Sequence, residues 1–351
     1  MMYSYSSAPN TGETVVLDCS NTWTTTDANE KWIVVGDGGG PEVAWHTMDL
    51  LGERVLVFGG DGGVTMPIQT RNDSTWLINL ASSTPITSAN SSTMSYGQQT
   101  TSDQPIRKIY SATSASPDHQ TIYPTGGEKA DGSGLGYKET WSVTISSQQI
   151  VTYKELPPLP TDLVHHQSIL LSNGTLLLLG GYIPSTSSFL PMSEAYMLDT
   201  SDTQDALWRT VAFHTSSQPA ARRGHTASLI AAQDGTEQIL LIGGTSSSNP
   251  SASASGQGEV LEDIWILDPA RGEWREISGN EQVNTGKRQE GPGKRETRDV
   301  LGKRGEVAGP GARYDHIAQV IGGQIVVFGG KFSPSLSLGH CIFSATYAAK
   351  Y

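Results

Sequence analysis

One short motif occurs five times in this chain and limits what the chain can fold into. In each copy a mostly apolar run ends in Gly-Gly, which is typical of a buried strand that ends in a tight turn. Successive copies lie 54 to 86 residues apart, a spacing that indicates one repeated structural unit with loops of variable length. The copies are Val55–Gly60, Thr121–Gly127, Leu176–Gly181, Ile239–Gly244 and Ile325–Gly330.

A second apolar strand precedes each diglycine strand, and an aromatic strand follows most of them. Strand, hairpin, strand, loop and strand make up most of a four-stranded antiparallel blade. Because each repeat buries its faces only against its neighbours, we expect residues 1–351 to form a single domain. The aromatic residues expected to pack between blades are Trp76, Trp141, Tyr196 and Trp265. Full units are predicted near 44–80, 107–155, 163–211, 222–277 and 313–347, with 14–23 as the remnant of a first one.

A diglycine after the second strand, followed by two spaced aromatic residues, resembles the kelch repeat. Local details are similar to the fungal kelch proteins grouped as "galactose oxidase, central domain", in particular Ala44–Thr47, Gly126–Gly134 and Gly311–His316. The resemblance implies an all-β kelch β-propeller. We expect six blades, the first one incomplete or shared between the N- and C-terminal strands, with five blades as the alternative.

Some segments depart from the repeat. Residues 81–106 are rich in Ser, Thr, Asn and Gln and are expected to form a solvated loop. Pro124 lies inside a diglycine strand, where it removes a ladder donor, so we expect a bulge or broken pairing there. Residues 279–312 carry three Gly-Lys-Arg triplets among Pro, Gly and Glu, which predicts a disordered basic insertion loop.

Composition excludes several classes of function. A formal charge of −12 disfavours nucleic acid and anionic membranes as partners, and no apolar run is long enough to span a bilayer. The two cysteines, Cys19 and Cys341, cannot make a thiolate-rich metal site, and whether they pair stays open. Proteins that this chain resembles are often secreted or membrane-anchored, so the compartment is undetermined, and a fragment of a longer surface protein is one interpretation of the chain.

The candidate binding residues lie where each first strand begins. Arg107, Arg222 and Arg313 each precede the expected first position of a strand by three residues, and Arg223 is adjacent. Equivalent loops of a propeller converge at one mouth of the central channel, so these arginines predict a basic ring that could hold carboxylates. The alternative is that they are structural and pair with nearby acids or carbonyls.

Histidine fills that first position in four of the five units, and Tyr110 fills it in the other. The histidines are His46, His166, His225 and His316. A metal site is one interpretation, but each histidine belongs to a different blade, which favours a repeated hydrogen-bonding role and predicts no bound metal. We include His225 and His316 with the four arginines as candidate binding residues at the central mouth.

The function expected from this pattern is binding rather than catalysis. We predict a non-enzymatic scaffold that presents its propeller loops to a protein or a glycan, with no cofactor. The alternative is a carbohydrate-active enzyme, a sugar isomerase or an oxidase-like protein, that uses the central mouth. Neither cysteine lies where a copper-radical oxidase would need one, and no phosphate-binding loop, nucleophile elbow or HExxH motif occurs.

Overall fold

The computed structural model describes the repeated units and the segments that join them. Nearly all of its regular structure is β-strand, and one 3₁₀ turn covers Pro184–Thr186. It describes residues 10–18, 32–35, 39–63, 73–79, 94–101, 103–131, 133–146, 148, 150–201, 206–213, 216–232, 234–247, 259–277, 311–321, 324–332 and 343–346.

Three four-stranded antiparallel sheets have their strands in sequence order, as expected for propeller blades. The first contains β3 (Thr47–Leu51), β4 (Arg54–Phe58), β5 (Thr75–Asn79) and β6 (Ser95–Gln98). The next contains β12 (Gln167–Leu170), β13 (Thr175–Leu179), β16 (Glu194–Asp199) and β17 (Arg209–Ala212). The third contains β18 (Thr226–Ala231), β19 (Glu237–Ile242), β20 (Ile264–Asp268) and β21 (Glu273–Glu276).

Smaller sheets complete the described set. One three-stranded sheet consists of β8 (Thr121–Ile122), β10 (Thr140–Ile145) and β11 (Val151–Leu156). Another consists of β22 (Arg313–Ile321), β23 (Gln324–Phe332) and β24 (Phe343–Thr346). Two-stranded sheets pair β1 (Thr14–Leu17) with β2 (Trp32–Val35), β7 (Lys108–Ile109) with β9 (Glu128–Lys129), and β14 (Tyr182–Ile183) with β15 (Ser188–Phe189).

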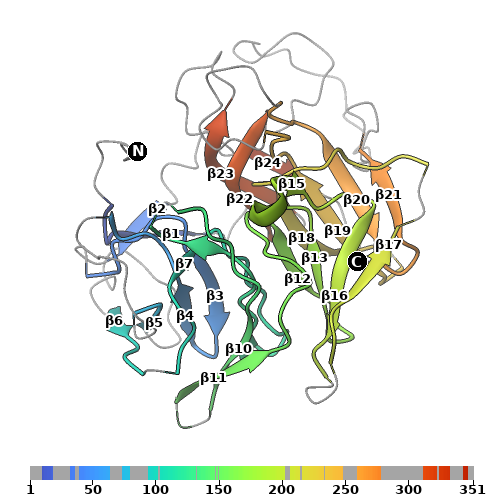
Figure 1. Cartoon of the computed structure of the whole chain (residues 1–351). Helices are drawn as coiled ribbons and strands as arrows, with labels where there is room; N and C mark the ends of the chain where they lie inside the picture. The colour runs from blue at the N-terminus through green and yellow to red at the C-terminus, as the bar shows by residue number, and fades with distance from the viewer. Residues whose placement is uncertain are drawn as a thin grey trace, which may run out of the picture.

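The sheets are arranged around a common axis (Figure 1). The first strands of neighbouring sheets contact each other, β12 with β18 and β18 with β22. The ring of Trp32 in β2 lies 4.9 Å from that of Phe328 in β23, so the first sheet in the sequence lies beside the last. The predicted all-β propeller is therefore confirmed, while the number of blades stays a prediction.

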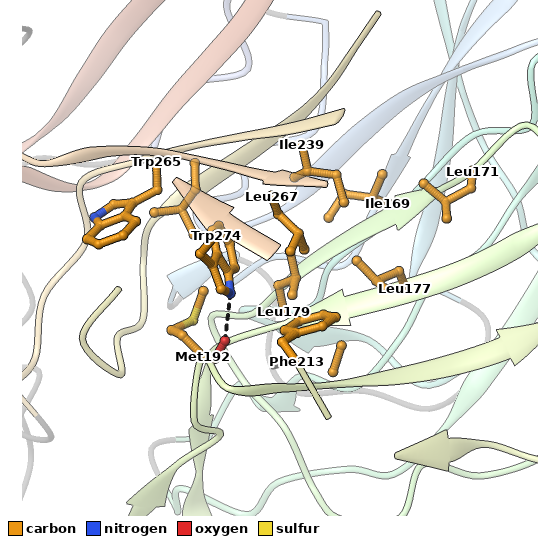
Figure 2. Close-up of a cluster of buried hydrophobic side chains, with 12 residues drawn as sticks. Ile169, Leu171, Leu177, Leu179, Met192, Phe213, Ile239, Trp265, Leu267 and Trp274 are labelled. Atoms are coloured by element: carbon orange, nitrogen blue, oxygen red, sulfur yellow. Dashed lines mark hydrogen bonds between the residues drawn. The ribbon is translucent and has the colours of Figure 1, made fainter. Parts of the chain in front are cut away.

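The largest part of the core lies between neighbouring blades, as Figure 2 shows. Leu177 and Leu179 of β13 pack with Leu241 of β19 and Trp265 of β20. Trp274 is 6% exposed and its indole N–H donates to the backbone oxygen of Met192, 2.8 Å away. Of the four aromatic residues expected between blades, the structure buries Trp141, Tyr196 and Trp265. Burying rings of this size is a major source of stability.

The diglycines allow the blades to approach closely. In the first four diglycines the N–H of the second glycine donates to a backbone oxygen in the next unit, and all four of these bonds measure 2.8 Å. Both glycines of each pair have positive φ, which other residues adopt at a cost. The bonds are Gly60 to Lys108, Gly127 to Leu163, Gly181 to Arg222 and Gly244 to Arg313.

Three segments that depart from the repeat can be compared with what the sequence predicted. Strand β6 lies inside residues 81–106, which were expected to form only a loop, and Tyr96 from β6 donates to the Thr14 hydroxyl 2.9 Å away. Strand β1 pairs with β2 at Trp32–Val35, which lies beyond the expected remnant at 14–23. The pairing of β8 with β10 ends at Ile122 and resumes in the same register as a bridge between Thr125 and Thr140. The N–H of Trp141 donates to the Pro124 oxygen at 2.9 Å, so the ladder is interrupted at Pro124 as expected but without a bulge.

Two further expectations lie outside the described residues. These are the loop at 279–312, apart from its last two residues, and the pairing of Cys19 with Cys341.

We predict that Gly126→Ala destabilises the chain by about 2–4 kcal/mol. A Cβ at Gly126 would lie 2.3 Å from the backbone oxygen of Leu163, in addition to the strain of a φ of 56°. Gly235 also has positive φ, but a Cβ added there would meet no atom within 4 Å, so Gly235→Ala is the matched control and costs about 1 kcal/mol. Denaturant unfolding of both variants measures the difference, and equal losses would contradict the packing role.

Candidate functional site

A series of backbone hydrogen bonds runs around the propeller axis at the end where the first strands begin. From the second to the fifth full unit, the N–H of one residue donates to the backbone oxygen of its equivalent in the preceding unit, over distances of 2.7 to 3.4 Å. We call these residues the inner ring and the surface on which they lie the ring face. The inner ring consists of Trp45, Tyr110, His165, Gly224 and Asp315.

Every residue of the inner ring has positive φ. For the four that are not glycine, φ lies between 52° and 57°, a region in which a side chain costs about 1–3 kcal/mol. Gly224, with a φ of 60°, shows that the backbone can form the ring without a side chain. Strained residues of this kind cluster at ligand-binding and active sites, so the four side chains indicate a functional surface.

A second set of side chains surrounds the inner ring. The residue after each diglycine pairs with the strand that leads into the inner ring, through bridges such as Ala44 with Asp61 and Arg223 with Thr245. We call this set the outer ring. It consists of Asp61, Glu128, Tyr182, Thr245 and Lys331.

One side of the ring face is aromatic. The rings of Trp45 and Tyr110 lie 5.4 Å apart, and Tyr110 stacks on the imidazole of His165 with 3.7 Å between centroids. Trp45 and Tyr110 are both partly exposed. Aromatic rings with one exposed part bind side chains or sugars with little loss of conformational entropy.

The other side of the ring face is charged. An Asp315 carboxyl oxygen lies 3.3 Å from Nδ1 of His165, and the other lies 3.5 Å from Nζ of Lys331. Burial raises the pKa of Asp315, but His165, Lys331 and Arg223 outweigh it and bring that pKa to about 2. Burial lowers the pKa of His165, although Asp315 opposes the change. Asp315 is therefore a carboxylate at neutral pH.

Glu128 of the outer ring differs from these paired groups. The described residues give its carboxyl neither a hydrogen bond nor an ion pair. Burial raises the pKa of Glu128 to about 7, while Arg223 opposes the rise and Asp131 adds to it. A carboxyl group with a strongly shifted pKa on a candidate binding surface is a further functional indicator.

The residues predicted from the sequence lie beneath this surface. Arg107, Arg222, Arg223, Arg313, His225 and His316 are all buried. Arg222 donates to both carboxyl oxygens of Asp263, at 2.6 and 2.7 Å, and to the Gly243 oxygen at 2.8 Å. Arg313 donates to the Gly329 oxygen, and Arg107 lies 3.4 Å from a carboxyl oxygen of Asp73. These contacts match the structural alternative, while binding by the six residues stays a prediction.

The predicted alignment of the second unit was wrong by one residue. Tyr110 lies in the inner ring with His165, so Ser111 rather than Tyr110 is equivalent to His166. The residue equivalent to Arg222 and Arg313 is consequently Lys108, whose backbone oxygen accepts the bond from Gly60. The Lys108 ammonium pairs with Glu139 at 2.9 Å. Sequence alone did not show this, because the irregular strand before Pro124 offers no clear register.

The histidines at the start of the first strands pack against the diglycines of the preceding unit. Cε1 of His166, His225 and His316 lies 2.6 to 3.2 Å from where a Cβ on the first glycine would be. Nε2 of His166 contacts the Thr125 hydroxyl at 2.9 Å, and that of His316 contacts the Thr226 hydroxyl at 3.0 Å. Within the described residues no group of three potential ligands is placed to hold a metal ion.

Comparison with known families agrees with this geometry. A family model described as the KLHDC2/KLHL20/DRC7 Kelch-repeats domain matches residues 45–291, about 70% of the chain. The chain belongs to the kelch-repeat family. The matched span covers four of the five diglycines of this kelch propeller. A search of curated proteins found no match.

The family result agrees with the predicted kelch fold but leaves the finer grouping with fungal galactose oxidase-like proteins as a prediction. Kelch domains generally mediate protein interactions, which agrees with the coarse expectation of an interaction scaffold. In the described part of the chain no helix has the length and apolar character of a membrane span.

We predict that Asp263→Asn lowers the free energy of unfolding by about 3 kcal/mol, because it leaves the fully buried Arg222 without its ionic partner. Asp268→Asn is the matched control, since Asp268 pairs at 3.7 Å with Arg271, whose side chain is 73% exposed. The control is expected to cost less than about 1 kcal/mol. Urea unfolding measures both, and an equal effect would contradict a structural role for Arg222.

Stability of the kelch propeller is expected to fall as the pH drops below about 6.5. Burial lowers the pKa of His166 to about 3, that of His316 to about 4 and that of His225 well below its usual value. The unfolded chain therefore binds protons that the folded chain excludes. For each histidine, the free energy of unfolding falls by up to about 1.4 kcal/mol for every unit by which the pH drops. The raised pKa of Glu128 acts in the opposite direction over part of this range, but burial also lowers the pKa of His46 and His165, so the histidines outnumber it.

Denaturant unfolding at a series of pH values measures this slope. His316→Gln is expected to reduce it, and His119→Gln, at an exposed position, is expected to leave it unchanged. If the free energy of unfolding of the wild-type chain did not change with pH, the lowered pKa values of the buried histidines would be contradicted.

Proposed function

We propose that this kelch propeller is a protein-interaction module whose binding site is the ring face. The observation that carries the proposal is the set of four strained side chains in the inner ring. The fold needs only the backbone of these residues, as Gly224 shows. Residues that are held in a costly conformation and that are not required by the fold are explained by binding.

The composition of the ring face favours a protein segment as the ligand. Aromatic residues with adaptable polar neighbours are typical of protein-binding surfaces, and this face has Trp45, Tyr110 and Tyr182 beside charged groups. The fixed positions of the two rings reduce the entropy lost when a partner binds. A glycan could stack on the same rings, and a carbohydrate-active enzyme stays the alternative function.

Selection of random linear peptides on the immobilised chain tests the proposal. We expect selected peptides to bind the wild-type chain and to lose affinity at least about tenfold with Tyr110→Gly, since an aromatic contact is worth on the order of 1 kcal/mol or more. Glycine at this position relieves the strain of positive φ, so the variant is expected to stay folded. Calorimetry measures the affinity.

Leu207→Ala is the matched control. Leu207 is 73% exposed and lies between β16 and β17, a connection at the opposite end of the blade because β16 begins near the ring face. Peptides that bind Tyr110→Gly as tightly as the wild-type chain, or that are lost with Leu207→Ala, would place binding elsewhere. Turnover of a simple sugar, abolished by Tyr110→Gly, would favour the enzyme instead.

A further inference from the structure

The outer ring contains a carboxyl group whose partner is missing from the described residues. Glu128 begins β9 and is half-buried, yet no described residue gives it a hydrogen bond or an ion pair. Its neighbour Lys129 is engaged by Asp131, with Nζ 2.7 Å from a carboxyl oxygen. Half-buried carboxyl groups are normally paired, so Glu128 indicates a ligand that supplies a positive charge.

We propose that Glu128 receives a basic side chain, arginine or lysine, from a protein partner bound to the ring face. This inference rests on the proposed function and adds the chemistry of the partner to it. Three features of the surroundings support it. They are the aromatic residues beside Glu128, the charges on the other side of the ring face, and the groups that surround its carboxyl.

Aromatic residues belong to the same face as Glu128. Glu128 pairs with Ile109, and the residue after Ile109 is the partly exposed Tyr110, whose ring lies 5.4 Å from that of Trp45. Aromatic rings attract ammonium and guanidinium groups, and the long stem of arginine or lysine packs on apolar surface while its charge stays polar. A carboxylate beside such rings is suited to a basic side chain.

Charges on the ring face favour one orientation of the bound cation. Lys331, whose side chain is 51% exposed, lies 3.5 Å from Asp315 and would repel a second cation there. Arg223 acts on both Asp315 and Glu128 and does not distinguish the two. On the aromatic side of the ring face the outer ring is acidic instead, because Asp61 belongs to the unit of Trp45 and Glu128 to the unit of Tyr110. The net charge of −12 also attracts a basic partner from a distance.

The groups around the Glu128 carboxyl come from several elements. Asp131 lies in the loop that follows β9, and Arg223, which leads into β18, approaches from two units away. The Nε of Arg223 donates to the Ser247 oxygen at 2.7 Å, which holds its guanidinium in place. His165 and Asp315 each interact with Arg223 and with Lys331, so Arg223 links the charged side of the ring face to Glu128.

Protonation of Glu128 removes the charge that this contact requires. Since the pKa of Glu128 in the free chain is about 7, affinity for a basic side chain is expected to rise with pH between about 6 and 8. Binding of the cation stabilises the carboxylate and therefore lowers the raised pKa of Glu128.

The test uses the full chain and peptides selected on it from a random library. We expect selected peptides to be enriched in arginine or lysine, and replacement of the basic residue by norleucine to weaken binding about tenfold. Glu128→Gln, which keeps the shape of the side chain, is expected to cause a similar loss and to flatten the pH dependence. Glu155→Gln removes the same charge from an exposed position on β11 and is the matched control.

The outcomes separate this inference from the function on which it rests. Peptides that are sensitive to Tyr110→Gly but insensitive to Glu128→Gln, or that contain no basic residue, would overturn the Glu128 contact and leave the ring face as the binding site. The absence of any bound peptide would overturn both. Thermal unfolding of Glu128→Gln that matches the wild-type chain establishes that a loss of binding is not a loss of fold.

Discussion

A backbone hydrogen bond between neighbouring units is the contact on which this propeller depends. The second glycine of a diglycine donates to the next unit at 2.8 Å, and the first glycine leaves room for that approach. A side chain at Gly126 would collide with the Leu163 oxygen. Because each blade buries its faces only against its neighbours, a wider spacing would open the core between β13 and β19 that Figure 2 shows.

The same contact divides the polar residues into two groups. Arg222 and Lys108 supply the accepting oxygens, and their side chains are held within the blade by Asp263 and Glu139. The residues of the inner ring follow two positions later, where the chain turns through positive φ at the surface. A few residues of sequence therefore separate side chains that hold the blades together from side chains of the ring face, where we propose that a partner binds.

Much of the scaffold was predictable from the sequence, and most of the surface chemistry was not. The diglycine runs located the second strands, and the aromatic strands located the third, because both depend on local apolar pattern. The irregular chain between Lys108 and Thr121 has no such pattern, so Tyr110 was assigned to the histidine position. Strand β6 was missed for a similar reason, since Ser95–Gln98 is polar and is held by pairing with β5.

The sequence by itself determined the repeat, the β-strand class and the need for glycine where blades meet, because these follow from residue type and spacing. Only the tertiary structure decided which residues share a surface. Trp45, Tyr110, His165 and Asp315 are far apart in the chain, and they meet because the propeller closes around its axis. The carboxyl group of Glu128 has no hydrogen bond or ion pair among the described residues, and this is recognised from what surrounds it and not from its place in the sequence.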